Sequence, residues 1–505
     1  MTKVLQSVNA AVWGAPALVL ILGVGLYLSV KLSFVQILLF PRACLEFLRK
    51  LRPGKTDASA FRALCTALAA TVGTGNLVGV AGAICLGGPG AVFWMWVCGI
   101  LGMATKFSEV TLALRYRKET KGGPMYVITG GLGSKWKPLA VVYCVFGIVA
   151  AFGVGNATQI NAMITGLNGV IAHFGGKETA AGNFLMGLVL AALVGSVLLG
   201  GAGRIGAAAE KLVPFVSGLY IMMCVGVLIV CRSRIPGAFA EIILGAFSPR
   251  AVTGGALGSA FTALRTGCSR GVFTNEAGMG TASIAHAQAN VRCPAEQGLM
   301  GIMEVFLDTI LICTLTALAI LCSGVPIPYG TDAGGILTAQ AFAAVYGSCA
   351  KLLLAFCLCC FAFATVLGWG LYGARCAEFL FGAKSWKVFA LAQTAAVTAG
   401  AVLDTASVWA IAETVNGLMA IPNLITLAML SNETLRLTNE YKKSGAEAGG
   451  GTYANFHQCK PLRTLSHEKV PPSGGCRQER GQEDLPSEHR PARSAHSGGL
   501  LRSHP

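Results

Sequence analysis

The fold of the chain follows from residues 69–90, AATVGTGNLVGVAGAICLGGPG, which lie within an apolar segment. The middle of this stretch combines glycines, which free the backbone, with side-chain oxygens. These residues are Thr71, Gly73, Thr74, Gly75, Asn76 and Gly79. In hydrocarbon each backbone N–H and C=O needs a partner, so irregular backbone persists only where it is buried in protein or lines a cavity. We therefore predict a membrane helix that is interrupted at mid-span and forms a site for an ion or a small polar solute.

A second interruption is predicted at residues 270–281, RGVFTNEAGMGT, in the other half of the chain. Its glycines and polar side chains again lie inside an apolar segment. Interrupted spans at corresponding positions of two halves are typical of secondary transporters that are built from inverted repeats.

The composition indicates a polytopic helical membrane protein. The 505 residues are 54% hydrophobic and 12% charged, about half of the ~25% charged residues in a typical soluble domain. The net charge of +16 is expected in cytoplasmic loops, so we predict no nucleic-acid partner. The 18 cysteines lack paired zinc-type spacing and are expected to be small buried residues rather than metal ligands or disulfides. No catalytic motif such as H-E-x-x-H is present, and we predict that the protein is not an enzyme and has no cofactor.

The hydrophobic pattern predicts eleven spans, each near the ~20 residues that cross a bilayer. They cover residues 12–34, 60–85, 90–116, 139–166, 183–200, 207–231, 255–287, 299–322, 346–381, 386–403 and 407–431. The two interrupted spans would then run antiparallel, as in an inverted repeat of five plus five spans. The repeats would be residues 60–231 and 255–431, with one extra span in residues 1–35.

The distribution of Lys and Arg predicts the orientation. Most of these residues follow the odd-numbered spans, and the main exceptions, Arg232, Arg234 and Arg250, follow the sixth. By the positive-inside rule the N-terminus lies outside and the C-terminus in the cytoplasm of a multi-pass plasma-membrane protein. Residues 445–505 are rich in Gly, Pro, Ser and charge, which predicts a disordered cytoplasmic tail.

The segment 73–76, GTGN, is the first candidate site. The N-terminus of a half-helix presents free N–H groups to a carboxylate, and unwound carbonyls with Thr and Asn oxygens suit Na⁺. The alternative is close helix packing through small residues, for which Gly75 and Gly79 have the spacing.

Other polar groups in the spans extend this site. Glu276 lies near mid-span, where an ionisable group is costly, and either has a functional role or caps free amides of the interruption. Gln159 is expected to face the interior, where it contacts a solute or bonds to another helix. Thr365 and Trp369 are an i, i+4 pair on one helix face, which lines a pocket or forms ordinary packing.

Two acidic residues of the eighth span, Glu304 and Asp308, form another i, i+4 pair. They suggest a proton relay or metal site, but structural polar anchoring is the favoured interpretation. Lys106 and Glu109 of the third span are predicted to form an internal ion pair. A proton-coupled transporter is the alternative to a Na⁺-coupled one, and Glu276 is then the best titrating group.

Several segments together carry a resemblance to a known family. The segments are residues 70–117 (ATVGTGNLVGVAGAICLGGPGAVFWMWVCGILGMATKFSEVTLALRYR), 271–287 (GVFTNEAGMGTASIAHA), 297–321 (QGLMGIMEVFLDTILICTLTALAIL), 365–373 (TVLGWGLYG) and 416–427 (NGLMAIPNLITL). They resemble the signature of the alanine or glycine:cation symporter family, and the likeness runs from about residue 12 to residue 431. The resemblance implies a leucine-transporter-like fold with one extra N-terminal span, and co-transport of a small neutral amino acid with Na⁺.

The resemblance also implies the residues of the site. The substrate pocket would consist of Thr74, Gly75, Asn76, Gln159, Phe273, Thr365 and Trp369. The cation ligands would be drawn from Thr71, Asn76, Thr274, Asn275 and Thr365. Glu276, Glu304 and Asp308 would have structural or coupling roles. The carboxylate of the amino acid is expected at residues 74–76 and its ammonium group at carbonyls around Phe273.

Overall fold

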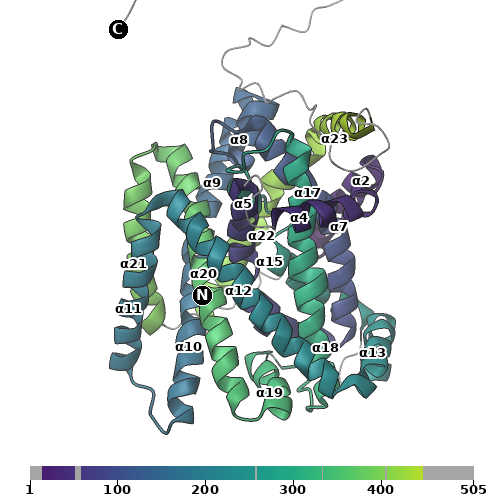
Figure 1. The fold of residues 1–505 in the computed structure, drawn as a ribbon, viewed down its shortest axis with the longest axis vertical. Coiled ribbons are helices and arrows are strands. Elements are labelled where there is room, and N and C mark those ends of the chain that lie inside the picture. Colours follow the sequence, from purple (N-terminus) through teal and green to yellow (C-terminus); the bar gives the residue numbers. More distant parts are fainter. Residues whose placement is uncertain (1–13, 52–57, 256–258, 332–333, 404–405, 447–505) are drawn as a thin grey trace, which may run out of the picture. The chain divides into compact units, whose positions relative to one another are not determined.

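The computed structural model describes residues 14–51, 58–255, 259–331, 334–403 and 406–446, all within the compact unit Met1–Leu462. Apart from a β-bridge between Lys118 and Lys121, the regular structure of these residues is helical (Figure 1). The elements are α2 (Ala15–Lys31), α3 (Val35–Leu38), α4 (Phe40–Lys50), α5 (Ala58–Thr71), η1 (Gly75–Gly79), α6 (Val80–Gly87), α7 (Gly90–Tyr116), α8 (Pro124–Val127), η2 (Ile128–Leu132), η3 (Ser134–Trp136), α9 (Lys137–Phe152), η4 (Gly153–Ala157), α10 (Thr158–His173), α11 (Ala180–Leu198), α12 (Gly201–Val230), η5 (Arg232–Arg234), α13 (Ile235–Phe247), α14 (Pro249–Val252), α15 (Ala260–Asn275), α16 (Thr281–His286), α17 (Pro294–Val305), η6 (Phe306–Cys313), α18 (Thr314–Ser323), α19 (Gly334–Tyr346), α20 (Cys349–Phe381), α21 (Ser385–Val402), α22 (Ala406–Met429) and α23 (Ser431–Ala446).

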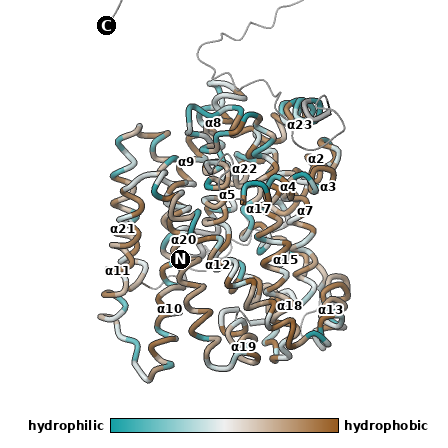
Figure 2. The backbone as a smooth tube through the Cα atoms, viewed as in Figure 1, coloured by the Kyte–Doolittle hydropathy of each residue, from teal (hydrophilic) through white to brown (hydrophobic). Residues whose placement is uncertain are grey.

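Six helical segments of the described chain are long and apolar enough to cross a membrane. They are Gly90–Tyr116, Ser134–His173, Ala180–Leu198, Gly201–Val230, Pro294–Ser323 and Cys349–Phe381. Two bent pairs, Ser59–Thr71 with Gly75–Gly87 and Thr414–Met429 with Ser431–Lys443, raise the number to eight if each pair is one span. Hydrophobic residues predominate along these helices (Figure 2). The chain therefore has the helices of a multi-pass membrane protein, and the eleven predicted spans stay a prediction.

The helices pack closely because small residues lie where they meet. Helix α7 contacts α15 and α17 over much of its length, and a Cβ at Gly267 of α15 would lie 2.2 Å from the carbonyl oxygen of Ala91. A Cβ at Gly368 of α20 would lie 2.8 Å from the Cβ of Ala70 on α5. Such contacts let backbones approach in a setting where helix association depends on close packing.

The first predicted interruption is shorter than expected. Helix α5 ends at Thr71, residues 72–73 form a bend, and helical backbone resumes at Thr74 with the π-helical turn η1. The two helical arms meet at an angle of 51°. The backbone recovers quickly because the side-chain oxygen of Asn76 accepts a hydrogen bond of 2.9 Å from the N–H of Gly73.

The second interruption is longer. Helix α15 ends at Asn275 and α16 begins at Thr281, and the φ angles of Glu276, Gly278 and Gly280 are all positive. Two freed N–H groups, those of Gly278 and Gly280, donate to one carboxylate oxygen of Glu109 on α7, at 2.8 and 3.1 Å. A neighbouring helix thus satisfies backbone donors that an interrupted membrane helix leaves open.

Some features of the fold were not predicted. Helices α19 and α23 lie outside the predicted spans. The predicted tail begins inside α23, at residue 445, and its remainder, residues 447–505, lies outside the described residues.

Candidate functional site

A small cavity lies between the two interruptions. It is lined by Ala70, Thr71, Gly73, Thr74, Gly75, Val154, Gln159, Phe273, Glu276, Thr365 and Trp369. The lining comes from the end of α5, the bend after it and the start of η1, from η4, α10 and α20, and from the end of α15 with the interruption that follows it. The free space holds about one water molecule, so a solute the size of an amino acid needs these side chains to move apart.

The cavity brings together most of the residues that were predicted to bind a substrate. Those that line it are Thr74, Gly75, Gln159, Phe273, Thr365 and Trp369. They come from segments far apart in the sequence, and a single small space at the interruptions is what the prediction requires. Asn76 is the predicted member outside this lining.

The polar groups of the cavity are held in place by hydrogen bonds. The hydroxyl of Thr74 donates to Oε1 of Gln159 at 3.2 Å, and Nε2 of Gln159 donates to the carbonyl of Val154 at 3.1 Å. The hydroxyl of Thr365 donates to the carbonyl of Phe361 at 3.0 Å, which leaves its oxygen lone pairs for another partner. A Cβ at Gly73 would lie 2.7 Å from this oxygen, so the bend passes directly against Thr365.

Asn76 faces a second group of polar residues, next to the cavity. Its Nδ2 donates to the carboxylate of Asp308 at 2.7 Å and to the carbonyl of Asp308 at 3.1 Å. Because its other side-chain atom holds the N–H of Gly73, Asn76 connects the bend to the turn η6. Asp308 is fully buried.

The same group reaches the second interruption through Thr309. This hydroxyl donates to Asp308 at 2.8 Å and accepts from Nδ2 of Asn275 at 3.1 Å. Oδ1 of Asn275 accepts from the N–H of Ala277 at 2.9 Å. Hydrogen bonds thus join both interruptions through η6, in a group that we name the Asp308 cluster: Asn76, Asn275, Asp308 and Thr309.

The residues predicted as cation ligands divide between these two places. Thr71 and Thr365 line the cavity, whereas Asn76 and Asn275 belong to the Asp308 cluster. The hydroxyl of Thr274 donates to the carbonyl of Gly271 at 2.8 Å. Thr309 was not predicted, and its position directly after Asp308 in FLDT was the available signal.

Glu304 and Asp308 contact different partners. The π-helical turn η6 begins at Phe306, between the two acids, and changes the register that an α-helix would give them. Glu304 contacts Lys106 and His286, whereas Asp308 contacts Asn76.

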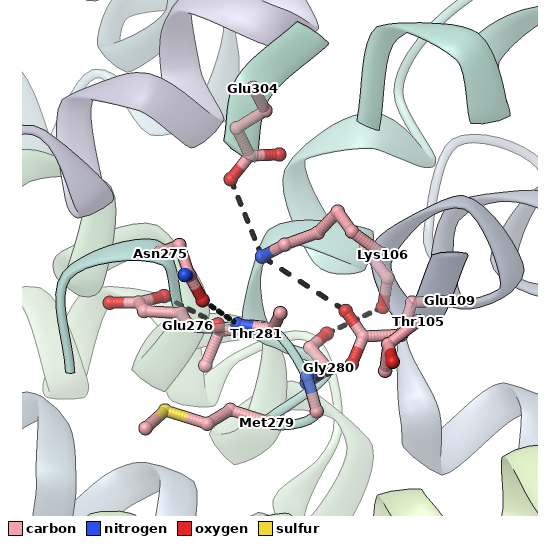
Figure 3. Close-up of polar contacts among 12 residues, drawn as sticks. Thr105, Lys106, Glu109, Asn275, Glu276, Met279, Gly280, Thr281 and Glu304 are labelled. Atoms are coloured by element: carbon pink, nitrogen blue, oxygen red, sulfur yellow. Dashed lines mark hydrogen bonds and ion pairs between the residues drawn. The ribbon is translucent and has the colours of Figure 1, made fainter. Parts of the chain in front are cut away.

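Lys106 is the centre of a buried ionic cluster, which we name the Lys106 cluster (Figure 3). Its Nζ lies 3.4 Å from Glu304 and 4.0 Å from Glu109. The predicted pair of Lys106 with Glu109 is therefore present, but the shorter contact is to Glu304. Nε2 of His286 lies 3.0 Å from Glu304, and Nδ1 lies 2.9 Å from the amide of Gln297.

Three π-helical turns carry or adjoin these polar groups. Turn η1 contains Asn76, η4 immediately precedes the helix of Gln159, and η6 contains Asp308. Such turns are rare and are frequent at functional sites. In the part of the chain that the structure describes, no group of His, Cys, Asp and Glu side chains is arranged as a metal centre.

Known proteins are similar to this chain over most of its length. The chain matches the sodium:alanine symporter family over residues 1–454. The sodium/alanine symporter AgcS of Methanococcus maripaludis is 41% identical over 459 residues, which cover 88% of this chain and 99% of AgcS. The amino-acid carrier protein AlsT of Bacillus subtilis is 36% identical over 433 residues, which cover 84% and 89% of the two chains.

A solved structure shows the fold class. The crystal structure of MhsT in complex with L-phenylalanine matches with a TM-score of 0.53 at 13% sequence identity, over 76% of this chain and 99% of that one. The fold is thus all-helical and leucine-transporter-like. From the family match, the relatives and the two interrupted helices around a small polar cavity, the chain belongs to the sodium:alanine symporter family.

Proposed function

We propose that the protein carries a small neutral amino acid, alanine or glycine, into the cell together with Na⁺ by alternating access. One observation carries the proposal: a small cavity at the two interruptions lies next to a fully buried carboxylate, Asp308, which has no ion-pair partner among the described residues. The cavity suits the solute, and the carboxylate suits a cation.

The cavity is suited to a small zwitterion. The backbone at Gly73–Gly75 and the hydroxyl of Thr74 would receive the carboxylate of the solute, because N–H groups at the start of a helical segment favour anions. Phe273 and Trp369 also line the cavity. These large rings leave little room for a side chain, which favours alanine or glycine over larger amino acids.

The Asp308 cluster is suited to Na⁺. Hard cations prefer carboxylate, carbonyl and hydroxyl oxygens. Asp308 and Thr309 supply a carboxylate and a hydroxyl, and the Nδ2 atoms of Asn76 and Asn275 hold these groups in place. A buried carboxylate without a cation costs several kcal/mol, and a bound Na⁺ would offset that cost. Thr71 and Thr365 line the cavity close to the expected position of the solute and would be ligands of a second cation there.

Asn76 would couple the ion to the solute. It bonds both to Asp308 and to the N–H of Gly73, which lines the cavity. A cation that orders Asn76 therefore also orders the backbone that receives the solute carboxylate. Each ligand would then raise the affinity for the other by the same factor.

One Na⁺ for each solute is sufficient for accumulation. An ion that enters down 100 mV releases about 2.3 kcal/mol, and a tenfold concentration gradient adds about 1.4 kcal/mol. Together these terms support accumulation of a neutral solute by a few hundredfold.

We extend the proposal to the whole architecture. The protein would have eleven spans, as a five-plus-five inverted repeat after one N-terminal span, with its N-terminus outside and its C-terminus in the cytoplasm of the plasma membrane. One interruption in each half of the chain and the likeness to MhsT support this arrangement. Helices that are shorter or more polar than a standard span, such as α2, α15 and α21, would supply the remaining crossings.

The test is uptake of labelled L-alanine by proteoliposomes that hold the purified full-length protein. An inward Na⁺ gradient is compared with choline and with an imposed pH gradient. Accumulation above equilibrium only with Na⁺ is the expected result, and unlabelled glycine and glutamine then rank the substrates. Uptake that follows the pH gradient without Na⁺ would replace Na⁺ by H⁺, and absence of uptake under both gradients would contradict the proposal.

A further inference from the structure

Glu276 occupies a backbone position that favours glycine. Its φ angle is 53°, in the left-handed region, where it caps the end of α15. Helices that end in this conformation usually have Gly or Asn there, because other side chains are strained. The two other positive-φ positions of this interruption are Gly278 and Gly280. The turn itself favours glycine at position 276, so the glutamate there must serve another purpose.

Glu276 is one of the residues that line the cavity. Among the residues that line it, Glu276 alone carries a formal charge. Its Oε2 accepts a hydrogen bond of 2.5 Å from Thr281 at the start of α16 (Figure 3). This bond fixes the direction of the carboxylate relative to the interruption.

Glu276 has no ion pair of its own among the described residues. The described ion pairs of the Lys106 cluster join Lys106 to Glu304 and Glu109, and His286 to Glu304, and none of them includes Glu276. Lys106 attracts Glu276 only from a greater distance. One lysine therefore serves three buried carboxylates.

The three carboxylates differ in how their charge is compensated. Glu109 accepts bonds from two backbone N–H groups and from the amide of Asn423, in addition to its pair with Lys106. Glu304 contacts both Lys106 and His286. Glu276, the one carboxylate that faces the cavity, accepts from the Thr281 hydroxyl. A carboxylate buried in this way is costly unless a cation joins it.

We infer that the Glu276 carboxylate binds the ammonium group of the transported amino acid, and so makes a primary amine a requirement for transport. This inference rests on the proposed function and deepens it. The solute would lie with its carboxylate at residues 73–75 and its ammonium group at Glu276, on opposite sides of the cavity. A carbonyl near Phe273, the partner expected from the resemblance, would then be an additional contact.

The test compares ligands that differ only in this group, with full-length protein in detergent and Na⁺. The readout is the concentration of L-alanine, and separately of L-lactate, that raises the melting temperature half-maximally. L-Lactate has a hydroxyl in place of the ammonium group. The wild type is expected to prefer L-alanine by at least about a hundredfold, because a site built for an N–H donor rejects analogues that lack it.

The variant Glu276→Gln removes the charge at nearly constant shape. Its affinity for L-alanine is expected to fall by about thirtyfold or more, the usual loss when one partner of a buried charge pair is removed. Its affinity for L-lactate should not fall, so the preference for L-alanine over L-lactate, expressed as the ratio of the two affinities, is largely lost. An affinity ratio that stays at the wild-type value overturns the inference.

Two further variants separate this role from a structural one. Glu304→Gln removes a carboxylate of the same cluster that does not line the cavity, and it should lower stability but leave the ratio unchanged. A collapsed ratio in Glu304→Gln would assign the effect to the charge of the cluster and overturn the inference.

Glu276→Asp withdraws the carboxylate by one methylene and should shift preference from L-alanine toward β-alanine. If Glu276→Gln does not fold, an unchanged β-alanine to L-alanine ratio in Glu276→Asp overturns the inference.

The outcome for the proposed function is read separately. The proposed function is overturned, and this inference with it, if L-alanine does not stabilise the wild-type protein in Na⁺ and the wild-type protein does not transport L-alanine. If the wild-type protein transports L-alanine with Na⁺ but the Glu276 variants keep the wild-type ratios of ligand affinities, only the role of Glu276 is overturned.

Discussion

The two interrupted helices differ in what holds their broken backbone. In the first, the bend at residues 72–73 is short, and a neutral side chain three residues along the same helix, Asn76, caps it. In the second, residues 276–280 have lost helical geometry, and a carboxylate from another helix, Glu109, holds two of the freed N–H groups. The bend of the first interruption is thus held by a neutral bond from its own segment, with Asp308 behind it through Asn76, whereas a carboxylate of α7 holds the second directly.

This difference indicates separate roles for the two segments. A bend held by one neutral bond can rearrange at low cost when a solute or cation arrives. Charge-assisted bonds are about twice as strong as neutral ones, so the anchored interruption is expected to stay in place as a fixed wall of the cavity. The comparison predicts that changes at the second interruption mainly reduce stability and that changes at the first mainly reduce transport.

The largest effect on stability is expected from Glu109→Ala. The variant leaves two backbone donors without a partner and removes one of the two carboxylates beside the buried Lys106, which keeps only Glu304. Removing one member of a buried ion pair costs about 3–5 kcal/mol. The melting temperature and the denaturant midpoint in detergent measure the loss. Glu440→Ala, at an exposed position in α23, is the control, with an expected change below about 1 kcal/mol. Equal losses in both variants would remove the basis for an anchored interruption.

Asn76→Ala is expected to affect stability less and transport more. It leaves the N–H of Gly73 and the carboxylate of Asp308 without a bond from this side chain, which costs about 1–3 kcal/mol. Na⁺-dependent uptake of alanine should be lost in proteoliposomes that contain folded protein. Asn161→Ala, at a half-buried position of α10, should retain uptake. Wild-type uptake by folded Asn76→Ala would show that Asn76 does not couple the ion to the solute.

The smallest effect is expected from Gly73→Ala. The added methyl group would lie 2.7 Å from the hydroxyl oxygen of Thr365, so the bend must shift, at a cost of about 1 kcal/mol. Gly79→Ala is the matched control, because a Cβ there meets no atom within 4 Å. The concentration of L-alanine that half-maximally stabilises the protein should rise about tenfold in Gly73→Ala alone, the equivalent of about 1.4 kcal/mol. The same value for both variants would mean that the bend does not contact the solute.

The sequence was most informative where function constrains local chemistry. Glycines and hydroxyl residues inside apolar spans are enough to mark both interruptions. The substrate residues that the family resemblance implied, from Thr74 to Trp369, lie around one cavity, apart from Asn76. Local backbone requirements of this kind are visible in a sequence because few residue types meet them.

The contacts between distant segments could not be predicted in this way. Lys106 and Glu109 share one helix, so their pairing was visible, whereas the closer contact of Lys106 with Glu304 depends on how α7 packs against α17. The separation of Glu304 from Asp308 depends on the π-helical turn η6, which has no simple sequence signal. Helix α19 was missed because it is shorter than the span length for which the hydrophobic pattern was searched.

The π-helical turns have a consequence for how such proteins change over evolution. A π-turn holds one residue more than an α-helical turn, and it can arise by a single-residue insertion into a helix. Deleting one residue from η4 would join α9 and α10 as one continuous α-helix, and Gln159 would keep about the same face because the wide turn absorbs its extra residue. The helix would survive, but the turn beside the cavity, whose Val154 carbonyl holds Gln159, would change. Single-residue insertions and deletions in η1, η4 and η6 are therefore a route by which relatives with this fold acquire different solutes.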